Sequence, residues 1–226
     1  MKTQAIIPTA GLGTRMRSTI PKTLLDINGV PMIIHTLRAF EKSKTINAVI
    51  LVVHPDYAEQ YRQLVEKYGI TKVKEYITGG NTRSESVGNG LTYVDPDCQI
   101  IVVHDGARPL ITPELIDKTV NLCIIEKAVI TGLPVMQTIK KVDVNESVVE
   151  KTLNREELWA IQTPQAFYKD VLVEAYQQAK SLDAPDDAAL VEQVGMRVKV
   201  LLGDPQNIKV TTAEDMIMAE KLLSAP

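Results

Sequence analysis

The sequence predicts an α/β fold: a Rossmann-like, mostly parallel sheet flanked by helices, with a protruding β-hairpin arm. Short runs rich in valine and isoleucine recur along the chain, and segments with helical spacing separate them, which is the rhythm of βαβ units. One stretch late in the chain instead alternates like a pair of antiparallel strands. A chain of 226 residues can bury one large core, so we expect a single domain over residues 1–226.

The strands are predicted from the apolar runs. These cover residues 5–7, 48–53, 100–103, 128–133 and 197–202. Near-continuous apolar runs are typical of parallel strands that helices cover on both faces. The loops that follow such strands therefore lie where open α/β sheets bind their ligands.

Helix patterns fall between and after these runs. They cover residues 32–40, 55–68, a segment from 113 onward, 168–182 and 212–223. The first three begin beside Pro31, Pro55 and Pro113, and proline is favoured in a first helical turn. Thr112 precedes Pro113 in the position of an N-cap, and Glu114 adds an early acid.

The hairpin arm is predicted over about residues 136–156. Residues 138–144 and 148–152 alternate as two antiparallel strands that turn at Asn145 and Glu146. The alternation determines which side chains share a face. Either water or a partner chain can cover that face.

Composition excludes several functions. A net charge of −3 provides no basic surface for nucleic acid, and 4% aromatic residues offer few stacking platforms. No apolar run approaches the roughly 20 residues that cross a bilayer, so we expect no membrane span and a cytoplasmic protein. Cys98 and Cys123 lie far apart without metal-ligand spacing, and we expect both to be reduced and structural. His35, His54 and His104 are also expected to be structural, because their spacing forms no metal cluster.

A glycine-rich turn follows the first strand. Residues 10–16 read Ala-Gly-Leu-Gly-Thr-Arg-Met, and Lys22 follows closely. Glycines at the end of a parallel strand let backbone N–H groups approach an anion, and Arg15 and Lys22 add two cations, which together favour a polyphosphate. The dinucleotide fingerprint fails at Met16 and no P-loop tripeptide follows. On this motif alone, a turn beside a solvated basic patch is an equal alternative.

Two further segments carry groups suited to a nucleotide. Gly79, Gly80, Asn81 and Ser86 supply small residues, an amide and a hydroxyl, which can read the edge of a base. Thr82 with Glu85 also has capping-box spacing, so a helix N-terminus can present Ser86. Asp105 follows the 100–103 strand, where a carboxylate can hold Mg²⁺ on substrate phosphates or cap a turn.

The motifs in order resemble those of the 2-C-methyl-D-erythritol 4-phosphate cytidylyltransferase family. The matching stretches are residues 10–16, Pro21-Lys22, 79–87, 104–109, 154–159, 162–165 and 207–211. Such a resemblance implies that CMP is transferred from CTP to the acceptor phosphate in non-mevalonate isoprenoid synthesis, with release of pyrophosphate. It implies a homodimer in which the arm of one subunit completes the acceptor site of the other.

The resemblance also implies roles for individual residues. Arg15, Lys22 and Lys209 would be catalytic; Ala10, Gly11, Gly13, Gly80, Asn81 and Ser86 would bind CTP; Arg108, Thr138, Lys140, Arg155 and Thr163 would bind the acceptor; and Asp105 would hold Mg²⁺ or another divalent cation. Arg155 and Thr163 are expected to flank the far end of the hairpin region and to act together on the neighbouring subunit's acceptor.

Four positions depart from the family pattern. Thr23, Gly106, Gln137 and Pro185 stand where glutamine, alanine, aspartate and threonine are usual. These changes leave the nucleotide side intact and affect mainly the acceptor side. The alternatives are therefore a ribitol 5-phosphate cytidylyltransferase, a hexose 1-phosphate nucleotidylyltransferase, which fits the later motifs poorly, and a CTP-binding module without turnover.

Overall fold

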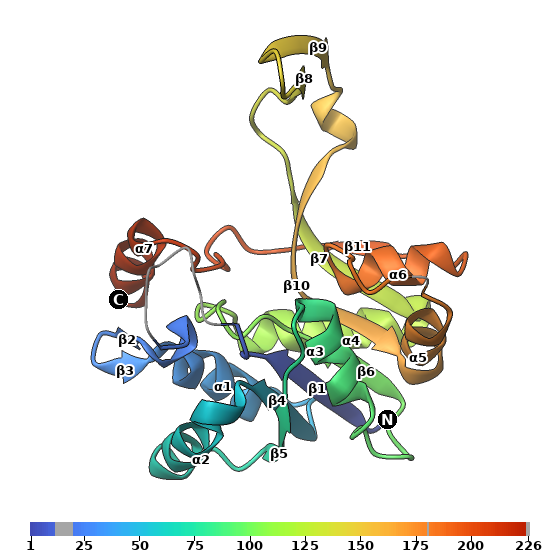
Figure 1. Ribbon diagram of the computed structural model, residues 1–226. Coiled ribbons are helices and arrows are strands. Elements are labelled where there is room, and N and C mark those ends of the chain that lie inside the picture. Colours follow the sequence, from blue (N-terminus) through green and yellow to red (C-terminus); the bar gives the residue numbers. More distant parts are fainter. Residues whose placement is uncertain (12–19, 180, 225–226) are drawn as a thin grey trace.

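The computed structural model describes residues 1–11, 20–179 and 181–224. A seven-stranded sheet with the order β11-β7-β10-β6-β1-β4-β5 forms the centre, and helices cover both of its faces (Figure 1). The strands are β1 (Thr3–Pro8), β4 (Ala48–Val53), β5 (Val73–Thr78), β6 (Ile100–Val103), β7 (Ala128–Pro134), β10 (Trp159–Tyr168) and β11 (Lys199–Leu202). The predicted fold class is confirmed.

The helices divide between the two faces. They are α1 (Met32–Lys42), α2 (Ala58–Lys67), α3 (Arg83–Leu91), α4 (Pro113–Glu126), α5 (Lys169–Gln178), α6 (Asp187–Gln193) and α7 (Ala213–Leu223), with short 3₁₀ turns at η2 (Lys22–Leu24), η3 (Pro55–Tyr57) and η4 (Arg155–Glu157). Apolar side chains of α1, α2 and α4 fill the core on one face, and those of α3, α5 and α6 fill it on the other. Helix α7 lies beside the small ribbon of β2 (Asp26–Ile27) and β3 (Val30–Pro31).

The carboxyl ends of the central strands meet at one edge of the sheet. Strand β1 runs parallel to β4 and β6, with Ile6 opposite both Ile50 and Val103. The segments that follow β1 and β6, which begin at Thr9 and His104, therefore lie side by side. This alignment brings two sequence motifs about a hundred residues apart to one place.

Several elements were absent from the sequence prediction. Strand β10 pairs antiparallel with both β6 and β7, and its ladder shifts register between Gln162 and Gln165. Pro164 lies within that shift, where no ladder N–H is required, and its presence hides the strand from a propensity argument. The helix predicted from residue 168 begins at Lys169, because Tyr168 still belongs to β10. Strand β5 and helix α6 were also not predicted.

The arm rises from the distal ends of β7 and β10 and stands clear of the body (Figure 1). Its tip is the antiparallel pair β8 (Lys140–Asp143) and β9 (Val148–Thr152), as predicted, with Asp143 opposite Val148. Every residue of β9 is exposed. A two-stranded ribbon with no core of its own is marginally stable in water, so the arm needs another surface to pack against.

Helix α3 lies unusually close to the sheet. Gly90 faces β1 and β4, and a Cβ atom placed there would lie 2.8 Å from Ile6 Cγ2 and 3.2 Å from Val52 Cγ2. Gly88, on the same helix, would meet only the Tyr176 ring at 3.4 Å. The absence of a side chain at Gly90 therefore sets the depth at which α3 sits, and with it the position of the residues at its N-terminus.

We expect Gly90→Ala to destabilise the fold by about 1–3 kcal/mol, because the added methyl group must push α3 off the sheet. Gly88→Ala is the matched control, and it should be neutral or stabilising by up to about 1 kcal/mol because alanine is the better helix former. Urea unfolding of the two variants measures the difference. Equal stability of the two would contradict the close contact at Gly90.

Candidate active site

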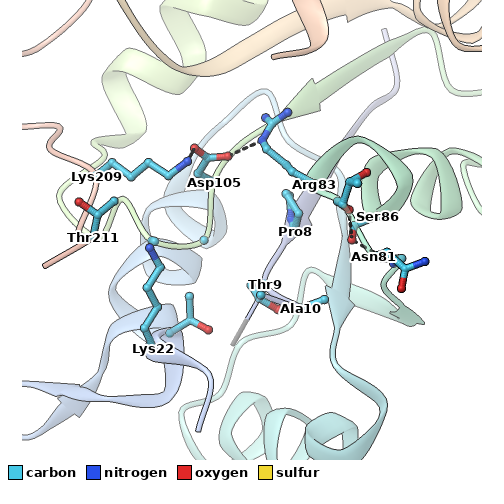
Figure 2. Close-up of a pocket in the computed structure, with 16 residues that line it drawn as sticks. Pro8, Thr9, Ala10, Lys22, Asn81, Arg83, Ser86, Asp105, Lys209 and Thr211 are labelled. Carbon is cyan, nitrogen blue, oxygen red and sulfur yellow. Dashed lines mark hydrogen bonds and ion pairs between the residues drawn. The ribbon is translucent and has the colours of Figure 1, made fainter. Parts of the chain in front are cut away.

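A cavity of about 360 Å³ opens at the carboxyl edge of β1 and β6. Its walls are Pro8, Thr9, Ala10, Gly11, Lys22, Thr23, Gly80, Asn81, Thr82, Arg83, Ser86, Asp105, Gly106, Ala107, Lys209 and Thr211. Most of the residues predicted for the nucleotide and the catalytic groups are thus brought together from five separate segments (Figure 2). The predicted residues Gly13 and Arg15 lie outside the described residues.

One wall of the cavity is the turn that begins α3. The Thr82 hydroxyl accepts a hydrogen bond from the Glu85 amide at 3.0 Å, and the Glu85 carboxylate accepts one from the Asn81 amide at 2.7 Å. Ser86 Oγ accepts from the Gly80 amide at 3.1 Å and donates to the Thr82 carbonyl at 2.9 Å. The predicted cap is therefore present, and Ser86 fixes the turn that holds Gly80 and Asn81 at the cavity.

The opposite wall is dominated by one carboxylate between cations. Asp105 Oδ1 lies 2.8 Å from Arg83 Nε, and Asp105 Oδ2 lies 2.7 Å from Lys209 Nζ. Figure 2 shows Arg83 and Lys209 reaching Asp105 from opposite sides. Burial alone would raise the pKa of Asp105, but the charges of Arg83 and Lys209 outweigh it and hold the pKa well below its usual range. Asp105 is therefore ionised at neutral pH.

Arg83 is a site residue that the sequence analysis missed. Besides Asp105 it contacts Asp187, with 2.9 Å between Nη1 and Oδ2, and Asp187 also accepts a hydrogen bond from the Tyr176 hydroxyl at 2.7 Å. Burial would lower the pKa of Arg83, but Asp187 and Asp105 together raise it above its usual value. A cation in the first turn of a helix interacts unfavourably with the helix dipole. This unfavourable position was the sequence signal that Arg83 has a function beyond helix formation.

Lys22 reaches the cavity from the 3₁₀ turn η2. Its ammonium donates to the Val210 carbonyl at 2.6 Å, and the Val210 amide donates to the Ala107 carbonyl at 2.8 Å. Figure 2 shows the Lys22 side chain pointing toward the side of the cavity that Lys209 and Thr211 occupy. The two lysines therefore share one wall although 187 positions of sequence separate them.

The base of this wall is a buried polar cluster. Arg108 Nη1 donates to the Asn207 carbonyl at 2.8 Å, and the Asn207 amide group donates to the Thr163 carbonyl at 2.8 Å. Arg108 Nε also lies 3.9 Å from Asp105 Oδ2. Arg108 is only 8% exposed, so it supports the segment that carries Lys209 from beneath.

Thr163 differs from its expected position. It was expected beside Arg155 at the end of the hairpin region, yet it is 4% exposed and lies under the cavity. Its hydroxyl accepts a hydrogen bond from the Asp105 amide at 3.0 Å and is 3.1 Å from His104 Nδ1. The register shift in β10 turns this part of the strand into the core. His104 is fully buried as expected, and burial lowers its pKa to about 3.

The other residues predicted for the acceptor lie on the arm. Lys140 donates to the Thr152 hydroxyl at 2.6 Å, and Arg155 donates to the Met136 carbonyl at 2.9 Å. Thr138, like Lys140 and Arg155, is exposed. None of the three lines the cavity of its own chain in the part that the structure describes.

Asp105 is the one carboxylate among the described residues that line the cavity, and among these residues no cluster of three or more His, Cys, Asp or Glu side chains could hold a metal by itself. Mg²⁺ commonly takes one or two carboxylates and completes its shell with substrate phosphates and water. Both oxygens of Asp105 already contact cations. The residues present therefore fit a divalent ion that substrate phosphates and water would mainly hold, with Asp105 as the candidate protein ligand.

The whole chain matches one protein family. The family model described as "IspD: 2-C-methyl-D-erythritol 4-phosphate cytidylyltransferase" matches residues 3–225. The chain belongs to this family. A relative of that name from Alkaliphilus metalliredigens is 43% identical over 226 residues, covering 99% of this chain and 93% of the relative. Another from Geobacillus thermodenitrificans is 40% identical, covering 100% of this chain and 98% of its own length.

Solved structures agree with the sequence comparison. The structure of 4-diphosphocytidyl-2C-methyl-D-erythritol synthase from Anaerococcus prevotii is 34% identical and superposes with a TM-score of 0.86 over 99% of both chains. The cytidylyltransferase from Thermus thermophilus has a TM-score of 0.80 at 27% identity over 100% of both chains. These relatives favour methylerythritol phosphate over ribitol phosphate or a hexose 1-phosphate as the acceptor.

No helix in the described part of the chain is long and apolar enough to span a membrane.

We expect Arg83→Met to destabilise the protein by about 3–5 kcal/mol, because it leaves the fully buried Asp187 without its charge partner. The double variant Arg83→Met, Asp187→Asn should recover part of this loss, since no unpaired charge then remains at position 187. Thermal and denaturant unfolding check both. Additive losses in the double variant would show that the two residues do not depend on each other.

Proposed function

We propose residue roles for cytidylyl transfer from CTP to 2-C-methyl-D-erythritol 4-phosphate, the activity of the family to which the chain belongs. The observation that carries the proposal is the distribution of charge around the cavity. Lys22, Arg83 and Lys209 present cations with a single carboxylate between them, and the α3 turn supplies peptide groups on the facing wall. This arrangement suits a base at one end and a polyphosphate at the other.

CTP is placed with its base at the α3 turn and its phosphates toward β1. The backbone carbonyls of Gly80 and Asn81 and the side-chain amide of Asn81 are the groups proposed to meet the base, because the N–H groups of both residues already donate to Ser86 and Glu85. Ala10 and Gly11 present backbone at the end of β1, where an anion can approach closely. Arg15 retains its proposed role on the triphosphate.

The reaction needs positioning and charge compensation more than a protein base. A phosphate oxygen of the acceptor attacks the α-phosphorus of CTP, the new phosphorus–oxygen bond forms, and the bond to the bridging oxygen breaks as pyrophosphate leaves. The acceptor phosphate is largely ionised near neutral pH, so no proton must be removed first. Asp105 is held by two cations and His104 is buried, which leaves both unsuited to act as the base. Lys22 and Lys209 would stabilise the charge that develops on the α-phosphate.

We expect Lys22→Ala to lower kcat on the order of a hundredfold or more, because it removes a charge that acts mainly in the transition state. The fold should survive. Lys74→Ala, at an exposed position of β5, is the matched lysine control and should keep normal turnover. Steady-state pyrophosphate release measures both, and an unchanged kcat in Lys22→Ala would remove Lys22 from the mechanism.

A divalent cation is proposed as the cofactor, with Asp105 and the phosphates of CTP as its ligands. When bound, such an ion neutralises phosphate charge and polarises the reacting oxygens. Chelation with EDTA should abolish turnover, and Mg²⁺ should restore it. Calorimetric titration of CTP in the presence of Mg²⁺ should show weaker binding for Asp105→Asn than for the native chain. Equal affinity would argue against Asp105 as a ligand.

We further propose a cytoplasmic homodimer in which the arm of each chain reaches the cavity of the other. Thr138, Lys140 and Arg155 are presented away from their own cavity on an exposed ribbon. Apolar side chains on the arm are also uncovered, including Met136 at 75% and Val144 at 89% exposure. Burial of these side chains against a second subunit would stabilise the ribbon and bring its cations to the acceptor phosphate.

A mixing experiment tests the arm proposal. Arg155→Ala and Lys22→Ala homodimers should each be nearly inactive, whereas subunits exchanged between them should regain activity. Mixed dimers then contain one cavity with both Lys22 and the partner's native arm. The control is a mixture of Lys22→Ala with Lys209→Ala. Both substitutions affect the same cavity wall, so a mixed dimer has a complete site only if one of these lysines acts across the interface. No recovery in the first mixture would place Arg155 outside the partner's site.

The acceptor is tested by pyrophosphate release from CTP with methylerythritol 4-phosphate, ribitol 5-phosphate or no acceptor. Release with methylerythritol phosphate alone is expected, and it would show that Gln137 and Pro185 are tolerated changes. Release with ribitol phosphate alone would transfer the activity to that alternative. CTP binding without release in any arm would support a non-catalytic module.

A further inference from the structure

Three buried hydroxyl groups meet beneath the cavity. The Tyr61 hydroxyl lies 2.7 Å from Thr23 Oγ1. The Thr9 side chain also acts to lower the pKa of Tyr61. Thr9 Oγ1 donates to the Val52 carbonyl of β4 at 2.8 Å. Thr9 and Thr23 are each 3% exposed, and Tyr61 is fully buried. We call Thr9, Tyr61 and Thr23 the hydroxyl cluster.

The hydroxyl cluster borders two segments that carry functional groups. Thr9 immediately precedes Ala10 and Gly11 at the end of β1, and Thr23 immediately follows Lys22 in η2. Thr9 and Thr23 both border the cavity. The contact between the Tyr61 hydroxyl and Thr23 therefore ties the turn that presents the lysine to α2.

Tyr61 is a core residue that reaches the site from outside the described cavity lining. It projects from α2, and no residue of α2 lines the cavity in the described part of the chain. Its ring packs in the core on the α1, α2 and α4 face. Burial raises the pKa of Tyr61 to about 12, with the side chains of Thr23 and Thr9 acting in the opposite direction, so the phenol keeps its proton. A buried tyrosine can place its hydroxyl more rigidly than an exposed polar side chain could.

We propose that Tyr61 is a positioning residue for cytidylyl transfer, which fixes the turn that carries Lys22 to α2 through Thr23. The proposal rests on the role proposed above for Lys22. Small displacements of a reacting group cost rate steeply, so a fixed link between the two segments matters to the transition state more than to the ground state. Loss of the link should therefore appear mainly in kcat and only weakly in KM for CTP.

The primary test compares kinetics of hydroxyl-deletion variants. Tyr61→Phe and Thr23→Val should each lower kcat on the order of tenfold, and their double variant should lose no more than the single variants, because each change breaks the same link. Thr23→Ser keeps the hydroxyl and should retain near-native kcat. Tyr168→Phe is the matched control, since it removes a tyrosine hydroxyl bond to the Ile124 carbonyl, 3.2 Å long, away from the site. Its kcat should stay native.

Thermal unfolding of every variant separates positioning from folding, and all kinetics are measured well below each midpoint. A Tyr61→Phe protein with native kcat, whatever its midpoint, would overturn the proposal and leave Tyr61 a core residue. The Lys22→Ala background separates this proposal from the role of Lys22. There, Tyr61→Phe should cause no further loss. The same tenfold loss in that background would overturn a link through Lys22, whereas an unaltered kcat in Lys22→Ala alone would refute the role of Lys22 itself.

Discussion

The structure depends on the buried charge of Asp105. The strands place a carboxylate, two lysine-bearing segments and a helix N-terminus at the same edge, and the ion pairs of Asp105 join the start of α3 to the segment that carries Lys209. Burial of an unpaired carboxylate would cost several kcal/mol, so Asp105 is tolerated only because both cations are present. The same ion pairs hold the first turn of α3 to the segment that follows β6 and orient Lys209 toward the cavity.

This arrangement also allows cations to gather before any substrate is bound. Lys22, Arg83 and Lys209 would repel one another around an empty cavity, and Asp105 offsets part of that repulsion. Arg83 is fixed by a second carboxylate, Asp187, whereas Lys209 is 37% exposed at its side chain and forms an ion pair only with Asp105 among the described residues. An anion that enters the cavity would therefore meet Lys209 as the more accessible of these two cations.

Local patterns allowed much of this architecture to be predicted. The Val- and Ile-rich runs at residues 48–53 and 100–103 coincide with β4 and β6, and Thr112 caps α4 as its sequence indicates. Sequence patterns did not predict the features that tertiary packing determines. Strand β10 contains Pro164 within a register shift, and Thr163 turns into the core for the same reason. Arg83 was missed because its partner Asp187 lies 104 positions away, and no local rule joins them.

The arm shows the same limit in another form. The alternation of its residues was sufficient to predict β8 and β9. Alternation does not indicate whether water or a partner chain covers a face of the ribbon. The structure adds that the cations at Lys140 and Arg155 are exposed and distant from their own cavity wall, while valines on the same ribbon are uncovered. The arm thus carries two of the cations proposed for the acceptor together with an apolar surface, both outside the core of the single chain. In the proposed dimer, assembly and acceptor binding depend on the same exposed arm, whereas the described residues proposed for the nucleotide all line the cavity of a single chain.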